Sequence, residues 1–89
     1  MRISGKQVTA ARDLLGLTQV ELAHAAGVNM HTVRSFEAGE REPRPSNLEK
    51  ICAELERRGI EFTNGDGPGV RLNLAKAEAF ARSQAEATD

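Results

Sequence analysis

Apolar residues recur at helical spacing in four segments of the chain. Spacings of three and four residues place each set on one face of a helix. The four apolar stripes are Val8, Ala11 and Leu15; Leu22, Ala23 and Ala26; Val33 and Phe36; and Leu48, Ile51 and Leu55. Short helices joined by short loops are typical of a compact helical cluster, so the pattern predicts four helices around an aliphatic core.

The residues that flank these segments are typical helix starts and stops. A capping box, Ser or Thr followed three residues later by Glu or Gln, satisfies free amides at a helix N-terminus. Such boxes occur at Ser4–Gln7, Thr18–Glu21 and Ser46–Glu49, and the remaining start has Asn29, itself a good N-cap. The expected stops are the glycines Gly16, Gly27, Gly39 and Gly59.

The second connection in this pattern is the shortest. Only Gly27, Val28 and Asn29 separate two expected helices. A three-residue turn that begins with glycine makes two helices cross at a steep angle, as in a helix-turn-helix. An ordinary helical hairpin can carry the same turn, so the turn alone does not identify a function.

After Gly59 the period changes from helical to alternating. Segments 60–63 and 70–74 alternate apolar and polar residues, and the glycine-rich segment 64–69 lies between them. The sequence therefore predicts a β-hairpin whose apolar face carries Ile60, Phe62, Val70, Leu72 and Leu74. The glycine spacing matches turn chemistry rather than a phosphate-binding loop. Residues 75–89 are rich in alanine and include only Phe80 as a large apolar group, which predicts a frayed helix or a disordered tail.

Length and composition limit the classes of protein to which the chain can belong. A chain of 89 residues forms one domain, which we divide into a helical part (1–59), a hairpin extension (60–74) and a tail (75–89). No apolar run approaches a membrane span, and the first residues lack the apolar stretch of a signal peptide, so we expect a cytoplasmic protein. One cysteine and two distant histidines match no metal motif, and no catalytic motif occurs. We therefore expect no enzyme activity, metal or cofactor.

The net charge gives little information about binding partners. The formal charge is −1, with nine Lys or Arg against eight Asp or Glu in residues 1–58 and three against five in residues 59–89. Any basic face must therefore come from the placement of the cations rather than from their total.

Residues 17–39 carry a more specific pattern. They read Leu-Thr-Gln-x-Glu-Leu-Ala, then Ala-Gly-Val, then Val-x-x-Phe-Glu-x-Gly. This segment resembles the Cro and phage-repressor helix-turn-helix family, also called XRE, and the resemblance extends over about residues 5–58. It implies a mainly α-helical, lambda-repressor-like domain of four to five helices, here with a C-terminal β-hairpin, that binds double-stranded DNA as a dimer.

The resemblance also implies roles for individual residues. Residues 29–38 would form the recognition helix. Because Val33 and Phe36 share its buried face, helix periodicity independently places Met30, His31, Arg34 and Ser35 on the other face. The candidates for base readout are Met30, His31, Thr32, Arg34 and Ser35. The candidates for phosphate contact are Gln19, Asn29, Arg41 and Arg44, although Glu40 and Glu42 lie between the two arginines. Arg12 and Glu37 match the internal ion pair of the family.

These expectations lead to two hypotheses. The first is a bacterial, cytoplasmic, nucleoid-associated transcription regulator that binds a palindromic operator as a homodimer, with the hairpin supplying the dimer contact. The alternative is a protein-interaction module on the same scaffold, such as an antagonist of a regulator or the antitoxin of a toxin–antitoxin pair. The acidic last third and the alanine-rich tail motivate this alternative, with a protein partner bound through the hairpin or the tail.

Overall fold

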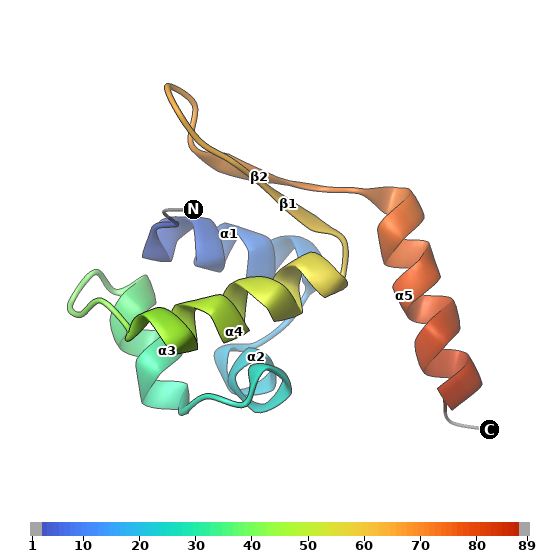
Figure 1. Cartoon of the computed structure of the whole chain (residues 1–89), viewed down its shortest axis with the longest axis horizontal. Coiled ribbons are helices and arrows are strands. Elements are labelled where there is room, and N and C mark those ends of the chain that lie inside the picture. Colours follow the sequence, from blue (N-terminus) through green and yellow to red (C-terminus); the bar gives the residue numbers. More distant parts are fainter. Residues whose placement is uncertain (1–2, 88–89) are drawn as a thin grey trace.

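The computed structural model describes residues 3–87, so the first two residues of the predicted helical part and the last two of the predicted tail lie outside it. Its helices are α1 (Gly5–Leu15), α2 (Gln19–Ala26), α3 (Met30–Glu37), α4 (Pro45–Arg57) and α5 (Leu74–Ala87). The strands β1 (Ile60–Thr63) and β2 (Gly69–Leu72) form the antiparallel hairpin between α4 and α5. A mainly helical fold with a C-terminal hairpin is thereby confirmed (Figure 1).

Helices α1 to α4 enclose one hydrophobic core. Its fully buried side chains come from the predicted stripes and include Val8, Leu22, Val33, Ile51 and Leu55. Helix α4 packs on α2, and the hairpin lies across α1 and α4 (Figure 1). The single cysteine, Cys52, is half-buried on α4 and packs against the edge of this core.

Three of the four predicted helix starts are confirmed and one is wrong. Ser4 and Thr18 form complete capping boxes with Gln7 and Glu21, and the Asn29 side chain accepts a hydrogen bond from the His31 amide at 2.8 Å. At α4, however, the N-cap is Arg44, which makes no side-chain capping bond, and Ser46 lies inside the first turn. The reason is Pro45, which has no N–H to satisfy and a backbone angle already suited to the first helical position.

Gly5 allows α1 to approach the end of α3 closely. A Cβ atom at Gly5 would overlap the Phe36 carbonyl oxygen and would lie only 2.7 Å from the carbonyl carbon. No other residue fits this crossing without displacing one helix. The first turn of α1 therefore sets the position of the last turn of α3.

The hairpin is attached to α1 by the buried side chain of Gln7. Its Nε2 donates to the carbonyl oxygens of Thr63 at 2.9 Å and Gly69 at 3.1 Å, and its Oε1 accepts from the Ser4 amide. Thr63 and Gly69 are partners at the loop end of the hairpin. One amide group thus caps α1 and holds both strands.

The apolar face of the hairpin packs on the core of the same chain. Ile60 pairs with Leu72 and Phe62 with Val70; Ile60 is buried, and the other three are half-buried against the core. The prediction for Leu74 is wrong, because this residue begins α5 and its surface is 69% exposed. The chain leaves the strand at Asn73, whose side chain accepts from the Lys76 amide and so caps α5.

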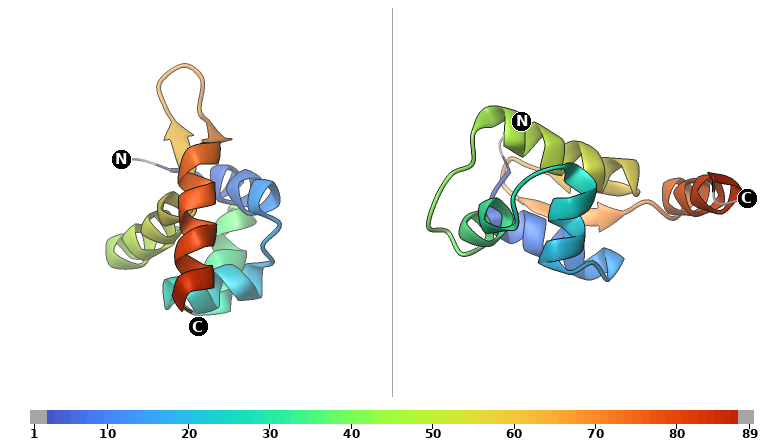
Figure 2. Two further views of the ribbon diagram at one scale, coloured as in Figure 1. Left: turned by 90° about the vertical axis from the view of Figure 1, so that its right-hand side faces the viewer. Right: turned by 90° about the horizontal axis from the view of Figure 1, so that it is seen from below.

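Helix α5 stands at the side of the helical cluster and contains no buried residue (Figure 2). Its base is fixed by the Asn73 amide, which donates to the Gly59 carbonyl at 2.8 Å. Further along, the Phe80 ring lies 4.9 and 4.8 Å from the guanidinium carbons of Arg57 and Arg58. The predicted tail is thus a helix over its described residues, and it contacts the rest of the chain mainly through one aromatic ring.

Candidate nucleic-acid interface

The turn between α2 and α3 sets the direction of α3. Gly27 adopts a left-handed conformation at φ 74°, and the amides of Gly27 and Val28 both donate to the Ala23 carbonyl at 3.0 Å. Such a C-terminal motif closes α2 without further residues, and Asn29 at once caps α3. Because Val33 and Phe36 are buried, the opposite side of α3 faces solvent.

The five candidates for base readout differ in exposure. His31 and Arg34 are exposed on α3, whereas Thr32 and Ser35 are half-buried. Met30 is also half-buried and packs against the hydrophobic core, so it projects less than helix periodicity alone suggests. The side chains freest to reach a ligand from α3 are therefore His31 and Arg34.

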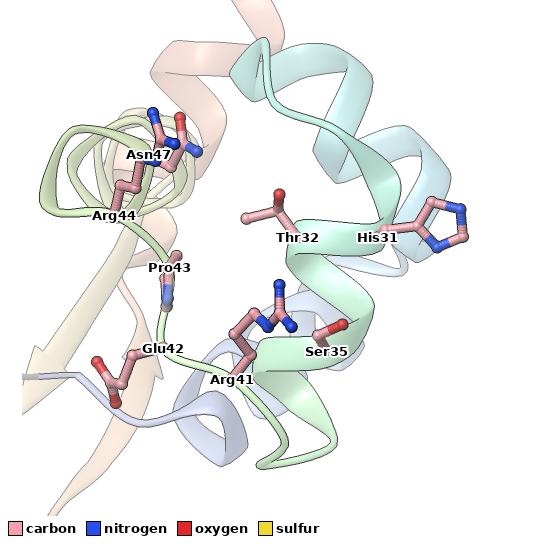
Figure 3. A pocket seen from close by; sticks show the side chains of 8 residues that line it. All are labelled: His31, Thr32, Ser35, Arg41, Glu42, Pro43, Arg44 and Asn47. Atoms are coloured by element: carbon pink, nitrogen blue, oxygen red, sulfur yellow. The ribbon is translucent and has the colours of Figure 1, made fainter.

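A groove runs along α3 beside the loop that leads into α4. Figure 3 shows Thr32 pointing from α3 into this groove, Arg41 lying beside Ser35, and His31 pointing away from α4. Its lining residues are His31, Thr32, Ser35, Arg41, Glu42, Pro43, Arg44 and Asn47. The groove thus brings together members of both predicted sets. Four predicted site residues do not line it, namely Gln19, Asn29, Met30 and Arg34.

Asn47 is the lining residue that sequence reasoning missed. It lies in the first turn of α4, and the sequence pattern treated it only as an interior position of a capping box. No local signal marks Asn47, because its place in the groove depends on how α4 lies relative to α3. The amide of Asn47 adds a neutral donor and acceptor between Arg44 and Thr32.

The cations of the chain divide into paired and unpaired groups. Among residues 3–87, five cations form ion pairs with three glutamates: Arg12 with Glu37, Arg57 and Arg58 with Glu54, and Arg71 and Lys76 with Glu61. Within the same range, the other cations are exposed and form no ion pair; three lie on α3 or in the loop after it, and three lie elsewhere, namely Arg34, Arg41 and Arg44, and Lys6, Lys50 and Arg82. The glutamates Glu40 and Glu42 are also exposed in this loop, so its basic character is modest.

A buried carboxylate holds the far end of α3 in place. Glu37 accepts from Arg12 Nε and Nη2 at 2.7 Å each, from Thr9 Oγ1 at 2.8 Å and from Gln19 Nε2 at 3.1 Å. The side chains of Arg12 and Glu37 are only 13% and 5% exposed. Burial raises the pKa of Glu37, but the donated bonds of Arg12, Gln19 and Thr9 outweigh it and lower that pKa overall.

Gln19 joins this cluster to the start of α2. One hydrogen of its amide is used on Glu37, which leaves the second hydrogen and the oxygen available. The backbone amides of the first turn of α2 lie beside it, under the Thr18 cap. This end of α2 is suited to an anion because free amides and the helix dipole both favour negative charge.

Neither a membrane segment nor a metal cluster occurs in the described part of the chain. Between residues 3 and 87, every helix is too short or too polar to cross a bilayer. The same range holds no group of three His, Cys, Asp or Glu side chains close enough to share an ion.

Comparison with known proteins agrees with the geometry of α2 and α3. Residues 8–62, more than half of the chain, match a protein family described as helix-turn-helix. The match begins in α1 and ends in β1, so it includes the turn, α3, the groove and the start of the hairpin. A search of curated proteins found no match.

Proposed function

The chain belongs to the Cro and phage-repressor (XRE) family of DNA-binding helix-turn-helix regulators, and we propose that it acts as a homodimer on a palindromic operator, with α3 in the major groove. In this proposal Arg34 pairs with a guanine and His31 and Ser35 read neighbouring bases, while Met30 contacts a thymine methyl from the edge of the helix. The phosphates on either side are contacted by Arg41 and Arg44 from the loop, by Gln19 at the start of α2 and by Asn29 at the start of α3.

The observation that carries the proposal is the distribution of unpaired cations. Arg41 and Arg44 line the groove, and Arg34 is exposed on α3, which forms one side of it. None of the three forms an ion pair with a carboxylate among the described residues. An arginine that is already paired internally would have to break that pair to bind a phosphate. The unpaired arginines can therefore bind DNA without losing a contact that stabilises the fold.

A second copy is needed for specificity. One helix of eight residues reads only a few base pairs. Two copies related by a two-fold axis read two half-sites separated by one or more whole helical turns of about 34 Å each, which gives the operator its palindromic form.

Base readout is tested by selecting bound duplexes from a random library and titrating the full chain against the selected operator and a scrambled duplex. Arg34→Ala should weaken binding to the operator by about ten- to a hundredfold and leave binding to the scrambled duplex almost unchanged. The charge-matched control is Arg71→Ala on the outer side of the hairpin, which should change neither. Operator affinity that is indifferent to Arg34→Ala would rule out direct readout by α3.

Phosphate contacts are tested by the salt dependence of the same titration. Arg41→Ala and Arg44→Ala should each weaken binding to both duplexes and reduce the slope of log K against log salt by about 1. If the library returns no bound duplex and the full chain instead copurifies with a second protein, the interaction-module alternative is favoured.

A further inference from the structure

The outward side of α5 carries two charged residues that form no ion pair within the described part of the chain. Contacts with the body use the capped first turn, Lys76, which pairs with Glu61 at 3.1 Å, and Phe80. Glu78 and Arg82 lie one turn apart on the side opposite Phe80, and both are exposed. Neither forms an ion pair with a described residue, not even with the other.

The order of these two charges makes this side of α5 self-complementary. When two identical helices lie antiparallel about a two-fold axis at the level of residue 80, position 78 of one faces position 82 of the other. We propose that α5 is the homodimer contact, with Glu78 of each copy paired to Arg82 of a second copy. The proposal rests on the homodimer proposed above and names its surface.

Two features favour a second copy as the occupant. A helix of 14 residues is marginal in water by itself, yet its direction is fixed by the Asn73 to Gly59 bond at its base. A helix that is held in position without being buried is preorganised for association. The other candidate surface, the apolar face of the hairpin, is used by the core of the same chain.

The position of α5 is also compatible with DNA binding. The loop that lines the groove and α5 lie at opposite ends of the long axis, as Figure 1 and the right-hand view of Figure 2 both show. Pairing through α5 therefore leaves α3 uncovered in both copies.

The test is a charge exchange in the full chain, with the dimer dissociation constant measured by analytical ultracentrifugation without DNA. Glu78→Arg and Arg82→Glu should each raise this constant about tenfold or more, because each variant faces two like-charge contacts across the axis. An equimolar mixture of the two variants should recover dimers of wild-type affinity, since both contacts across the axis then join an arginine to a glutamate. Circular dichroism checks that each variant keeps its helix content.

The mixture separates contacts between copies from effects within one helix. Each single variant also places like charges four residues apart in its own α5, and mixing does not relieve that repulsion. Loss of dimer without recovery on mixing would overturn the proposal, as would a dimer that ignores both variants or a wild-type chain that is monomeric. A dimer insensitive to both variants would still leave the proposed homodimer intact, and the duplex titrations test DNA binding independently.

Discussion

At the scale of single residues, buried polar groups with several partners determine how α3 is held. Glu37 has four donated bonds from three side chains, and Gln7 uses both its nitrogen and its oxygen. The family resemblance predicted the pairing of Arg12 with Glu37, and the capping box predicted one bond of Gln7. The resemblance also implied that Gln19 braces the recognition helix, and its bond to Glu37 does so. Neither signal predicts the donor Thr9 or the bonds from Gln7 to the hairpin, because these contacts depend on how distant elements cross.

Glu37→Gln should lower the free energy of unfolding by about 3 kcal/mol at pH 7, since it leaves the buried charge of Arg12 without a counter-charge. The pKa of Glu37 is lowered in the folded state, so its stabilising contribution is present above the unfolded value of about 4.3 and is lost as pH falls through the folded value. Urea denaturation measured at several pH values from 7 to 3 should show that the free energy of unfolding falls less with acid in the variant than in wild type.

The charge-matched control for this prediction is Glu40→Gln, which removes an exposed carboxylate from the loop. Its denaturation midpoint at pH 7 should equal that of wild type. An equal loss of stability in both variants would mean that net charge, rather than the cluster around Glu37, accounts for the effect.

At the scale of elements, the local signals predicted where most helices begin but not how they cross. Side-chain caps and apolar stripes are encoded within a few residues, so Ser4, Thr18 and Asn29 are readable from sequence. The error at Ser46 has the same local origin, because Pro45 is the stronger start signal one position earlier. The contact of Gly5 with Phe36 joins residues far apart in sequence and has no local signature.

Gly5→Ala tests this helix crossing. Alanine usually stabilises a helix relative to glycine by about 1 kcal/mol, but here its methyl group would overlap the Phe36 carbonyl oxygen. The clash should dominate and lower the free energy of unfolding by about 1–3 kcal/mol. Gly67→Ala, where the added methyl group meets nothing within 4 Å, is the matched control and should be almost neutral in the same denaturation assay. A stabilised Gly5→Ala variant would contradict the close approach of α1 and α3.

At the scale of the whole molecule, the chain separates two surfaces. The loop that follows α3 and lines the groove lies at one end, and α5 lies at the other (Figure 1). Composition predicted a frayed or disordered tail because Phe80 is its only large apolar residue. The structure places this one ring against Arg57 and Arg58, and both arginines are also paired with the buried Glu54. No periodicity within the tail could reveal partners that lie at the end of another helix.

Phe80→Ala should release α5 from α4 without unfolding the rest of the chain. Cation–π contacts at exposed sites contribute about 0.5–1 kcal/mol each, so amide hydrogen exchange in α5 should accelerate several-fold. Exchange in β1 and β2 of the same molecules is the internal control and should not change. Equal acceleration in the hairpin would mean that Phe80 supports the whole extension rather than α5 alone.

The half-buried thiol of Cys52 gives this small domain a natural reporter of how its fourth helix is packed. Burial, with a smaller contribution from Glu56, raises the pKa of the thiol to about 11, so very little reactive thiolate exists near neutral pH while α4 stays packed. Alkylation of the folded chain should therefore be much slower than alkylation of the same thiol in the urea-unfolded chain. Because the sequence contains no other cysteine, an alkylating reagent adds mass at Cys52 alone, and the ratio of its rates in the folded and unfolded chain measures how far packing on α4 protects this thiol, without any label or engineered residue.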